Sequence, residues 1–366
     1  MKQLNKVLLL LLLLISLLSC ATVKPKYSLY RENGKYGLID TNRKVVLPAD
    51  FDEIKQNEVY LCQKNDGISY VYDKTLNVLH TFDSNDNKIT IIAPWLFYFV
   101  KGKYINTHQG DWYLLNLITK EQTKVPNSEY FEGNISTEPW VASRYEFYSK
   151  DMQLVSKFYG RVYPYRENRA VIVEDWNEPA NIIDENFSIV VSGIYASADY
   201  YSEGLIPVVF SSSIDDESKC RKSCYLDTDG NIVYECDFDF SYTSRSTIKH
   251  LQIPLVIGSF VENVAVVKAK ENQWFILDRD FNKHYLPKGY EVESYSYSNG
   301  LLLVSKTENK EKKYGFVDKN CNVVIPCEFS YAESFDGKYA IVEKEGKDAV
   351  INQKGKVYYC SDLKTK

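Results

Sequence analysis

Short apolar runs separated by polar turns occupy most of the chain after its first 26 residues. A typical run is Tyr339-Ala340-Ile341-Val342, and many of the others are rich in Tyr, Phe and β-branched residues. Such residues favour strands, and no later segment shows the periodicity of an amphipathic helix. The pattern therefore predicts an all-β protein built from many short strands.

One pattern recurs: a strand, a polar turn, a second strand ending in Asp or Asn, a tight turn and a third strand. Its two clearest copies begin at Tyr36 and Tyr314. The residue that ends the second strand marks each copy: Asp40, Asp73, Asn116, Asp151, Asp184, Asp227, Asp278, Asp318 and Asn352. From position 40 to position 352 the markers make eight steps with a mean of 39 residues. Residues 27–360 are therefore predicted to form a repeat array of about eight to nine units, followed by a polar tail, 361–366.

The marker has a chemical reason. A leading Asp or Asn accepts hydrogen bonds from backbone N–H groups across a hairpin, and glycine takes a position with positive φ. Gly230 and Gly355 stand there in two copies, but Arg43 and Cys321 stand there in the clearest ones, so either those residues are strained or the turn differs. The segment 227–230 is also similar to the start of a calcium loop. Because the later ligands are missing, a plain hairpin is favoured.

Lys35-Tyr36-Gly37 and Lys313-Tyr314-Gly315 are each followed by Ile-Asp or Val-Asp and by Val-Val-x-Pro. This resembles the bacterial WG (KWG) repeat, with Tyr in place of the usual Trp. The resemblance covers residues 34–54 and 299–355, whereas Trp112-Tyr113 and Trp274-Phe275 keep an aromatic residue but lack the glycine. It implies an all-β repeat domain, often exported, without catalytic residues to transfer. The repeat-motif residues are Tyr36, Gly37, Asp40, Pro48, Tyr314, Gly315, Asp318 and Pro326, with the two tyrosines predicted to be equivalent core positions.

A unit of about 39 residues with three or four strands is the size of a propeller blade. A β-propeller-like ring is favoured over an open β-solenoid because closure hides the sheet edges that an open array must protect. Closure is expected if the final strands, 349–352 and 356–359, complete the first sheet.

The N-terminus has the order of a secretory signal, with Lys2 and Lys6 before an apolar run, residues 7–18. As a helix this run reaches roughly 18 Å, well short of the roughly 30 Å hydrocarbon core of a bilayer. Leu17-Leu18-Ser19-Cys20 resembles the bacterial lipobox. We therefore predict a signal peptide at 1–19, lipid attached to Cys20 and a tether at 20–26. Ala21 as second mature residue favours the outer membrane. The alternative is an ordinary signal peptide with a chance cysteine.

Charge and cysteine content narrow the function classes. The chain has a net charge of −5, and losing the two signal lysines makes it −7, which argues against nucleic acid as a partner. Seven cysteines remain besides Cys20: Cys62, Cys220, Cys224, Cys236, Cys321, Cys327 and Cys360. Cys220 with Cys224 or Cys236, and Cys321 with Cys327, are near enough in sequence for disulfides, but small buried hydrophobes are favoured. A zinc site is disfavoured because there is no Cys-x-x-Cys pair.

No nucleophile elbow, phosphate loop or metalloprotease motif is present, the four histidines are scattered, and Asp215-Asp216 lie in a polar stretch. Tyr200-Tyr201 and Tyr295-x-Tyr297 are candidates for stacking on sugars or gripping peptide, although half-buried strand positions are the simpler interpretation. The sequence thus predicts a non-catalytic binding or scaffolding lipoprotein of the envelope, without cofactor or metal, with envelope proteins or glycans as partners. The alternative is an envelope glycan hydrolase with two carboxylates in a cleft.

Overall fold

The computed structural model describes residues 26–56, 60–65, 68–83, 89–91, 97–98, 112–116, 122–124, 140–143, 146–148, 154–157, 161–162, 166–173, 180–194, 197–198, 201–211, 221–236, 257–268 and 273–364. The predicted signal peptide and lipidated Cys20 lie outside these residues, as do Asp151, Tyr200, Asp215-Asp216 and Cys220.

The described residues form nine small sheets in chain order. The first four comprise β1 (Tyr27–Glu32), β2 (Lys35–Asp40) and β3 (Val45–Phe51); β4 (Glu53–Gln56), β5 (Tyr60–Gln63), β6 (Ile68–Tyr72) and β7 (Val78–Asp83); β8 (Ile89–Ile91), β9 (Phe97–Tyr98), β10 (Trp112–Asn116) and β11 (Gln122–Lys124); and β12 (Trp140–Ser143), β13 (Glu146–Tyr148) and β14 (Leu154–Lys157).

The remaining five sheets comprise β15 (Arg161–Val162), β16 (Arg169–Val173), β17 (Ala180–Asp184) and β18 (Ile189–Ile194); β19 (Ser197–Ala198), β20 (Ile206–Ser211), β21 (Arg221–Leu226) and β22 (Ile232–Glu235); β23 (Val264–Lys268), β24 (Trp274–Asp278) and β25 (Lys283–Tyr285); β26 (Tyr290–Val292), β27 (Leu302–Glu308), β28 (Glu311–Val317) and β29 (Val323–Phe329); and β30 (Tyr331–Ala332), β31 (Tyr339–Lys344), β32 (Lys347–Asn352) and β33 (Val357–Tyr359), after which a short 3-10 helix, η2 (Cys360–Asp362), follows.

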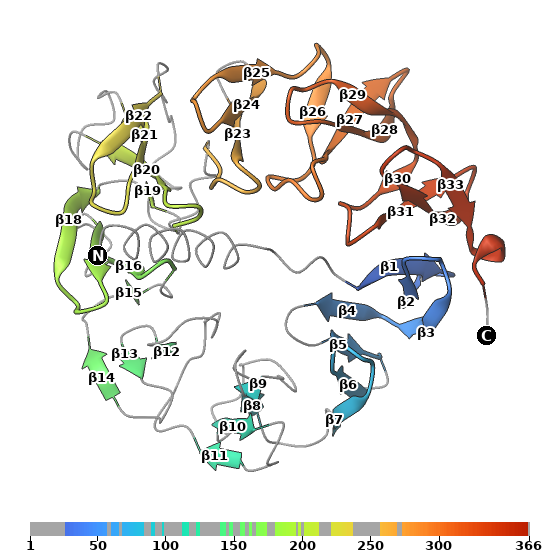
Figure 1. The fold of residues 1–366 in the computed structure, drawn as a ribbon, viewed down its shortest axis with the longest axis horizontal. Coiled ribbons are helices and arrows are strands. Elements are labelled where there is room, and N and C mark those ends of the chain that lie inside the picture. The colour runs from blue at the N-terminus through green and yellow to red at the C-terminus, as the bar shows by residue number, and fades with distance from the viewer. Residues whose placement is uncertain are drawn as a thin grey trace, which may run out of the picture.

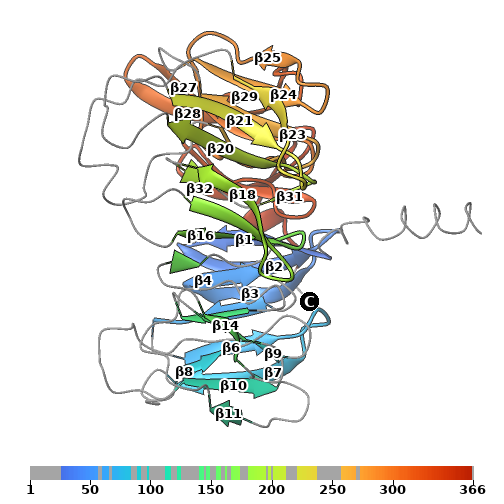
Figure 2. The same ribbon diagram turned by 90° about the vertical axis from the view of Figure 1, so that its left-hand side faces the viewer.

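The sheets stand around a ring in which the last one, β30–β33, lies beside the first, β1–β3 (Figure 1). Within a sheet the first strand lies nearer the centre and the last lies outward, as β4–β7 shows most clearly (Figure 1). Seen from the side, neighbouring sheets face one another (Figure 2). The all-β prediction and the propeller-like ring are confirmed. One detail is wrong: the final strands do not complete the first sheet, because β32 pairs with β31 and β33 pairs with β32.

Apolar side chains fill the space between consecutive sheets. Between the eighth and ninth sheets they include Phe316, Ile325, Phe329, Phe335 and Ile351. The Phe316 and Phe335 rings meet edge to face with their centroids 4.9 Å apart. Burial at about 25 cal/mol per Å² of apolar surface makes these inter-sheet layers the main stabilising element of the ring.

The marker residues close hairpins as predicted. Asp40 Oδ1 accepts the N–H groups of Asn42 and Lys44 at 2.8 and 2.9 Å, and Asp318 Oδ1 accepts those of Asn320 and Asn322 at 2.9 Å. The same pair of bonds occurs at Asp73, Asp184, Asp227, Asp278 and Asn352. The residue three positions after the marker has a positive φ, which is 65° at Arg43 and 63° at Cys321, as at Gly230 (86°). The turn is therefore the same, and the non-glycine residues tolerate the left-handed conformation.

Candidate functional site on the outer strands

The two clearest repeat copies have the same strand register. Tyr36, Leu38 and Ile39 pair with Phe51, Leu47 and Val45, and Tyr314, Phe316 and Val317 pair with Phe329, Ile325 and Val323. In each copy the third strand has a bulge. Between two consecutive pairs the chain advances by two residues on the second strand but by four on the third. Both motif tyrosines are half-buried, so they are equivalent positions but not fully buried ones.

The motif glycine and proline meet at this bulge. A Cβ on Gly315 would lie 2.5 Å from the carbonyl oxygen of Ile325 and 2.7 Å from the carbonyl carbon of Pro326. A Cβ on Gly37 would lie 2.6 Å from the oxygen of Leu47 and 2.7 Å from the carbon of Pro48. The glycine is therefore needed because the bulged backbone occupies the place of a side chain.

The positive-φ residue of a hairpin contacts the outer strand of the preceding sheet. Phe281 stacks on Tyr234 of β22 with 4.9 Å between the ring centroids, and the Cys321 thiol donates to the His284 carbonyl of β25 at 2.9 Å. Arg43 places its guanidinium 4.1 Å from the ring centroid of Tyr358 in β33. The contact between Arg43 and Tyr358 joins the first sheet to the ninth. The ring is therefore closed by a contact at the same position as those that join consecutive sheets.

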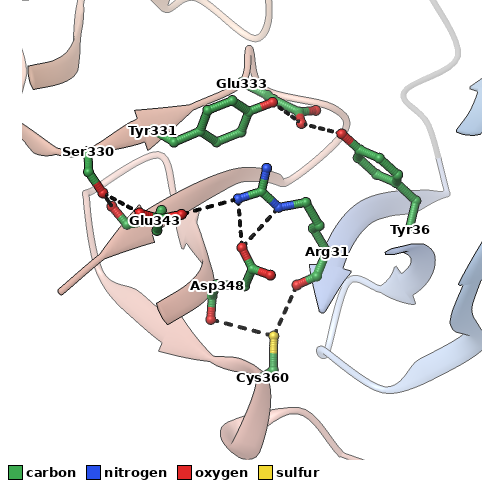
Figure 3. A network of polar contacts seen from close by, with 8 residues as sticks. All are labelled: Arg31, Tyr36, Ser330, Tyr331, Glu333, Glu343, Asp348 and Cys360. Atoms are coloured by element: carbon green, nitrogen blue, oxygen red, sulfur yellow. Dashed lines mark hydrogen bonds and ion pairs between the residues drawn. The ribbon is translucent and has the colours of Figure 1, made fainter. Parts of the chain in front are cut away.

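Figure 3 shows a second, polar part of this closing joint between β1–β3 and β30–β33. Arg31 donates from Nε and Nη2 to Asp348 Oδ1 at 2.9 and 2.6 Å, and Nη2 lies 3.7 Å from Glu343 Oε2. Its guanidinium lies 4.3 Å from the ring centroid of Tyr331. Charged hydrogen bonds between segments over 300 residues apart specify which sheets meet.

Two further carboxylates, Glu333 and Asp336, take part in the joint. Glu333 Oε1 accepts the hydroxyls of Tyr36 and Tyr331 at 2.9 and 2.7 Å, and burial together with Glu333 raises the pKa of Tyr36. Asp336 accepts the Leu29 N–H at 3.0 Å and the Gln56 side-chain amide. Burial raises the pKa of Asp336, and these two hydrogen bonds act in the opposite direction.

The outer strands carry the exposed large aliphatic side chains of the described residues. They are between 40 and 58 % exposed and lie at the start of β7, β18, β22 and β29: Val78, Ile189, Ile232, Val233, Val323 and Val324. Each of these four strands is the last of its sheet, and among the described strands none pairs with its outer side. An aliphatic side chain beside an open edge is the usual chemistry of peptide and protein contacts. We name these six residues the rim residues and take them as the candidate site.

The tyrosines that the sequence suggested for stacking are mostly structural. Tyr201 and Tyr297 are buried, and their hydroxyls donate to the carbonyls of Asp227 and Asp318 at 2.9 Å. Burial raises the pKa of Tyr201 to about 12. Tyr295 is 55 % exposed, with its ring 5.6 Å from that of Trp274. The sequence-based suggestion was therefore wrong for Tyr201 and Tyr297.

The described cysteines are free thiols, and Cys62, Cys224, Cys236 and Cys321 are buried. The buried-hydrophobe interpretation is right for these four, and a Cys321–Cys327 disulfide is wrong. Burial raises the pKa of Cys62 to about 12. Within the described ranges no three His, Cys, Asp or Glu side chains gather in a way that suits a metal ion. The same part of the chain contains no helix with the length and apolar character needed to cross a membrane.

The chain carries WG-containing repeats: the family model of that description matches residues 36–58, 182–210 and 314–347. The first and third segments are those that the Tyr-Gly and Val-Val-x-Pro motifs indicated. The middle segment was indicated only by the spacing of its marker, Asp184, because Ile182-Ile183 before it lacks a Tyr-Gly pair and no proline follows Ile189-Val190-Val191.

Solved structures of similar fold share little sequence with this chain. BamB from Moraxella catarrhalis is 11 % identical, with 84 % of this chain and 86 % of that one covered and a TM-score of 0.36. The β-propeller domain of the Trilobed protease from Pyrococcus furiosus is 9 % identical, with 93 % and 98 % covered and a TM-score of 0.39. The Dos1 propeller is 11 % identical, with 93 % and 95 % covered and a TM-score of 0.38. Among curated proteins no relative matches.

Proposed function

We propose that the protein is an exported lipoprotein, lipidated on Cys20 and held to the outer membrane, whose ring is a non-catalytic binding or scaffolding domain for an envelope protein. The rim residues carry this proposal. They repeat at equivalent places on four sheets, and a partner that spans several sheets gains contact area with each one. A tether of a few residues between the lipid and β1 keeps the ring close to the membrane surface.

An envelope glycan hydrolase is the competing function. It needs two carboxylates about 5 to 10 Å apart in a cleft. Glu343 and Asp348 approach one another, but both face the guanidinium of Arg31 inside the closing joint. This arrangement supports ring closure rather than glycan cleavage, and no observation favours the hydrolase.

Photo-crosslinking tests the binding function. A photo-crosslinking residue replaces Val323 in the full lipidated chain, which is expressed in the cells that naturally make it. We expect it to capture a discrete envelope protein. The same residue in place of Glu311, which is exposed in the β27–β28 hairpin, is the matched control and is expected to capture none. Equal capture from both positions, or turnover of an envelope polymer that is abolished by changing one Asp or Glu, would contradict the proposal.

Lipidation needs its own experiment. Replacing Cys20 with Ser is expected to remove metabolic labelling by palmitate and to release the protein from the membrane, because the predicted anchor is a thioether on that cysteine. Normal labelling of Cys20→Ser would refute the anchor and leave the binding function to be judged by the crosslinking result.

A further inference from the structure

One outer strand already holds a peptide segment, which comes from the chain itself. After η2 the C-terminal segment runs beside the start of β3, where Lys364 pairs in parallel with Lys44. The Val45 N–H donates to the Lys364 carbonyl at 2.9 Å, and the Lys364 N–H donates to the Arg43 carbonyl at 3.0 Å. A single residue thus uses both of its backbone groups on the sheet edge.

The residue before that pair supplies the apolar contact. Leu363 is only 7 % exposed and packs with Tyr30, Ile39, Tyr339 and Val350, and Val45 packs against the same cluster. Val45 is half-buried as a result. The bound segment is therefore an extended peptide whose leucine enters the sheet interface and whose next residue pairs with the edge.

The start of β29 presents the same groups, and no described segment pairs with it there. Val323 is the counterpart of Val45, because each is the fifth residue after its marker and each pairs with the last apolar residue of the second strand. Both hairpins are closed by the same bonds around Asp40 and Asp318. The shared register directs the Val323 N–H and the Cys321 carbonyl to the open edge. Val323 and Val324 are 40 and 41 % exposed.

We propose that the starts of β7, β18, β22 and β29 bind extended, leucine-containing peptide segments of a partner protein as added parallel strands, in the way that β3 binds residues 363–364. This inference rests on the proposed binding function and states the chemistry of its partner. A peptide in extended conformation presents its N–H and C=O groups at the spacing that the edge uses, whereas a glycan has no backbone with that spacing. We expect a leucine because the segment that β3 holds places Leu363 in the cluster against which Val45 packs, and an aliphatic residue stands at the counterpart of Val45 in the other four strands: Val78, Ile189, Ile232 and Val323.

A labelled synthetic peptide with the sequence of residues 359–366, added to the unlipidated mature chain, is the probe. We expect saturable binding. A peptide with Asp in place of the leucine, and one N-methylated at the lysine that follows it, are each expected to bind at least tenfold more weakly. The protein with Val78, Ile189, Ile232 and Val323 all changed to Asp is expected to lose binding, whereas Lys347→Asp, on an exposed residue of β32, is the matched control and keeps it.

Two results would overturn the inference: no binding at millimolar peptide, or binding that neither N-methylation nor the fourfold variant changes. Because the chain's own residues 363–364 occupy β3, only a loss of binding in the protein variant distinguishes the four open strands from exchange of the peptide at β3. Val323→Asp alone replaces the fourfold variant if that variant does not fold. The crosslinking test at position 323 does not depend on this peptide. If a partner is captured there but the peptide does not bind, the added strand is refuted and the binding function stands. Failure of both would refute the two together.

Discussion

The first sheet, β1–β3, and the eighth, β26–β29, carry the two clearest copies of the repeat in different surroundings. Arg31 and Ser305 are counterparts, since each pairs with the motif tyrosine on the next strand. The Ser305 hydroxyl donates to Glu293, just after β26 in the same sheet, at 2.6 Å. Arg31 instead donates to Asp348 in the neighbouring sheet, because the described first sheet has no inner strand like β26.

Among the described residues, the last sheet is the one that bonds to the inner edge of β1. The Leu29 N–H donates to Asp336, and the Ser28 hydroxyl accepts the Lys338 N–H at 3.0 Å. The repeat therefore determines the hairpin, the bulge and the glycine–proline contact in both sheets, whereas the neighbouring sheet determines what the remaining positions bind. Four sets of substitutions test this comparison.

The largest effect is expected in the apolar layer of the eighth sheet. Phe316→Ala should lower the free energy of unfolding by about 3 to 5 kcal/mol, because a fully buried ring is lost from the layer against Phe335. Leu38→Ala at the matching position of the first sheet should cost about 2 to 4 kcal/mol. Urea unfolding of both variants measures this. A Phe316→Ala cost below that of Tyr314→Ala, at the half-buried motif position, would contradict the assigned register.

Arg31→Met comes next. We expect a loss of about 2 kcal/mol, because Asp348, whose side chain is 17 % exposed, is left without its charged partner. Ser305→Ala in the eighth sheet should cost about 1 kcal/mol, since Glu293 keeps its bond to Lys312. A double-mutant cycle of Arg31→Met with Asp348→Asn isolates the pair, and zero coupling between them would refute the closing ion pair.

A smaller difference is expected between the motif tyrosines. Tyr36→Phe removes the bond to Glu333 and should cost about 1 kcal/mol. Tyr314→Phe should be close to neutral, because among the described residues its hydroxyl has no such bond. Equal losses in equilibrium unfolding of the two variants would show that the closing joint does not use Tyr36.

Asp336→Asn should change the pH dependence of stability rather than its maximum. The raised pKa of Asp336 means that its contribution is complete below the unfolded value near 3.8 and is lost as the pH rises through the folded value. Asparagine still accepts the Leu29 N–H but stays neutral. Relative to the parent, the variant should therefore gain stability as the pH rises from the unfolded value near 3.8 through the raised folded value. Lys74 and Glu333, which act on Asp336, are unchanged in it. A difference that does not vary with pH would contradict this.

The local features of the fold could be predicted from the sequence because their causes are local. The hairpin at Asp318 and the glycine at 315 are determined by residues within a dozen positions. The Arg31–Asp348 pair and the seating of Leu363 join residues more than 300 positions apart and leave no periodic signal. From the sequence, the rim residues could be recognised only through the Val-Val pair of the motif. The exposure of their side chains could not be predicted, because it depends on what covers each outer strand.

Among the described residues the outer edge is occupied in the first sheet and open in the eighth, and amide hydrogen exchange of Val45 and Val323 distinguishes the two edges. We predict that the Val45 amide is protected, that deleting residues 363–366 removes this protection, and that the Val323 amide exchanges fast in both proteins. Equal protection of the two amides in the intact chain, or protection of Val45 that survives the deletion, would contradict the account.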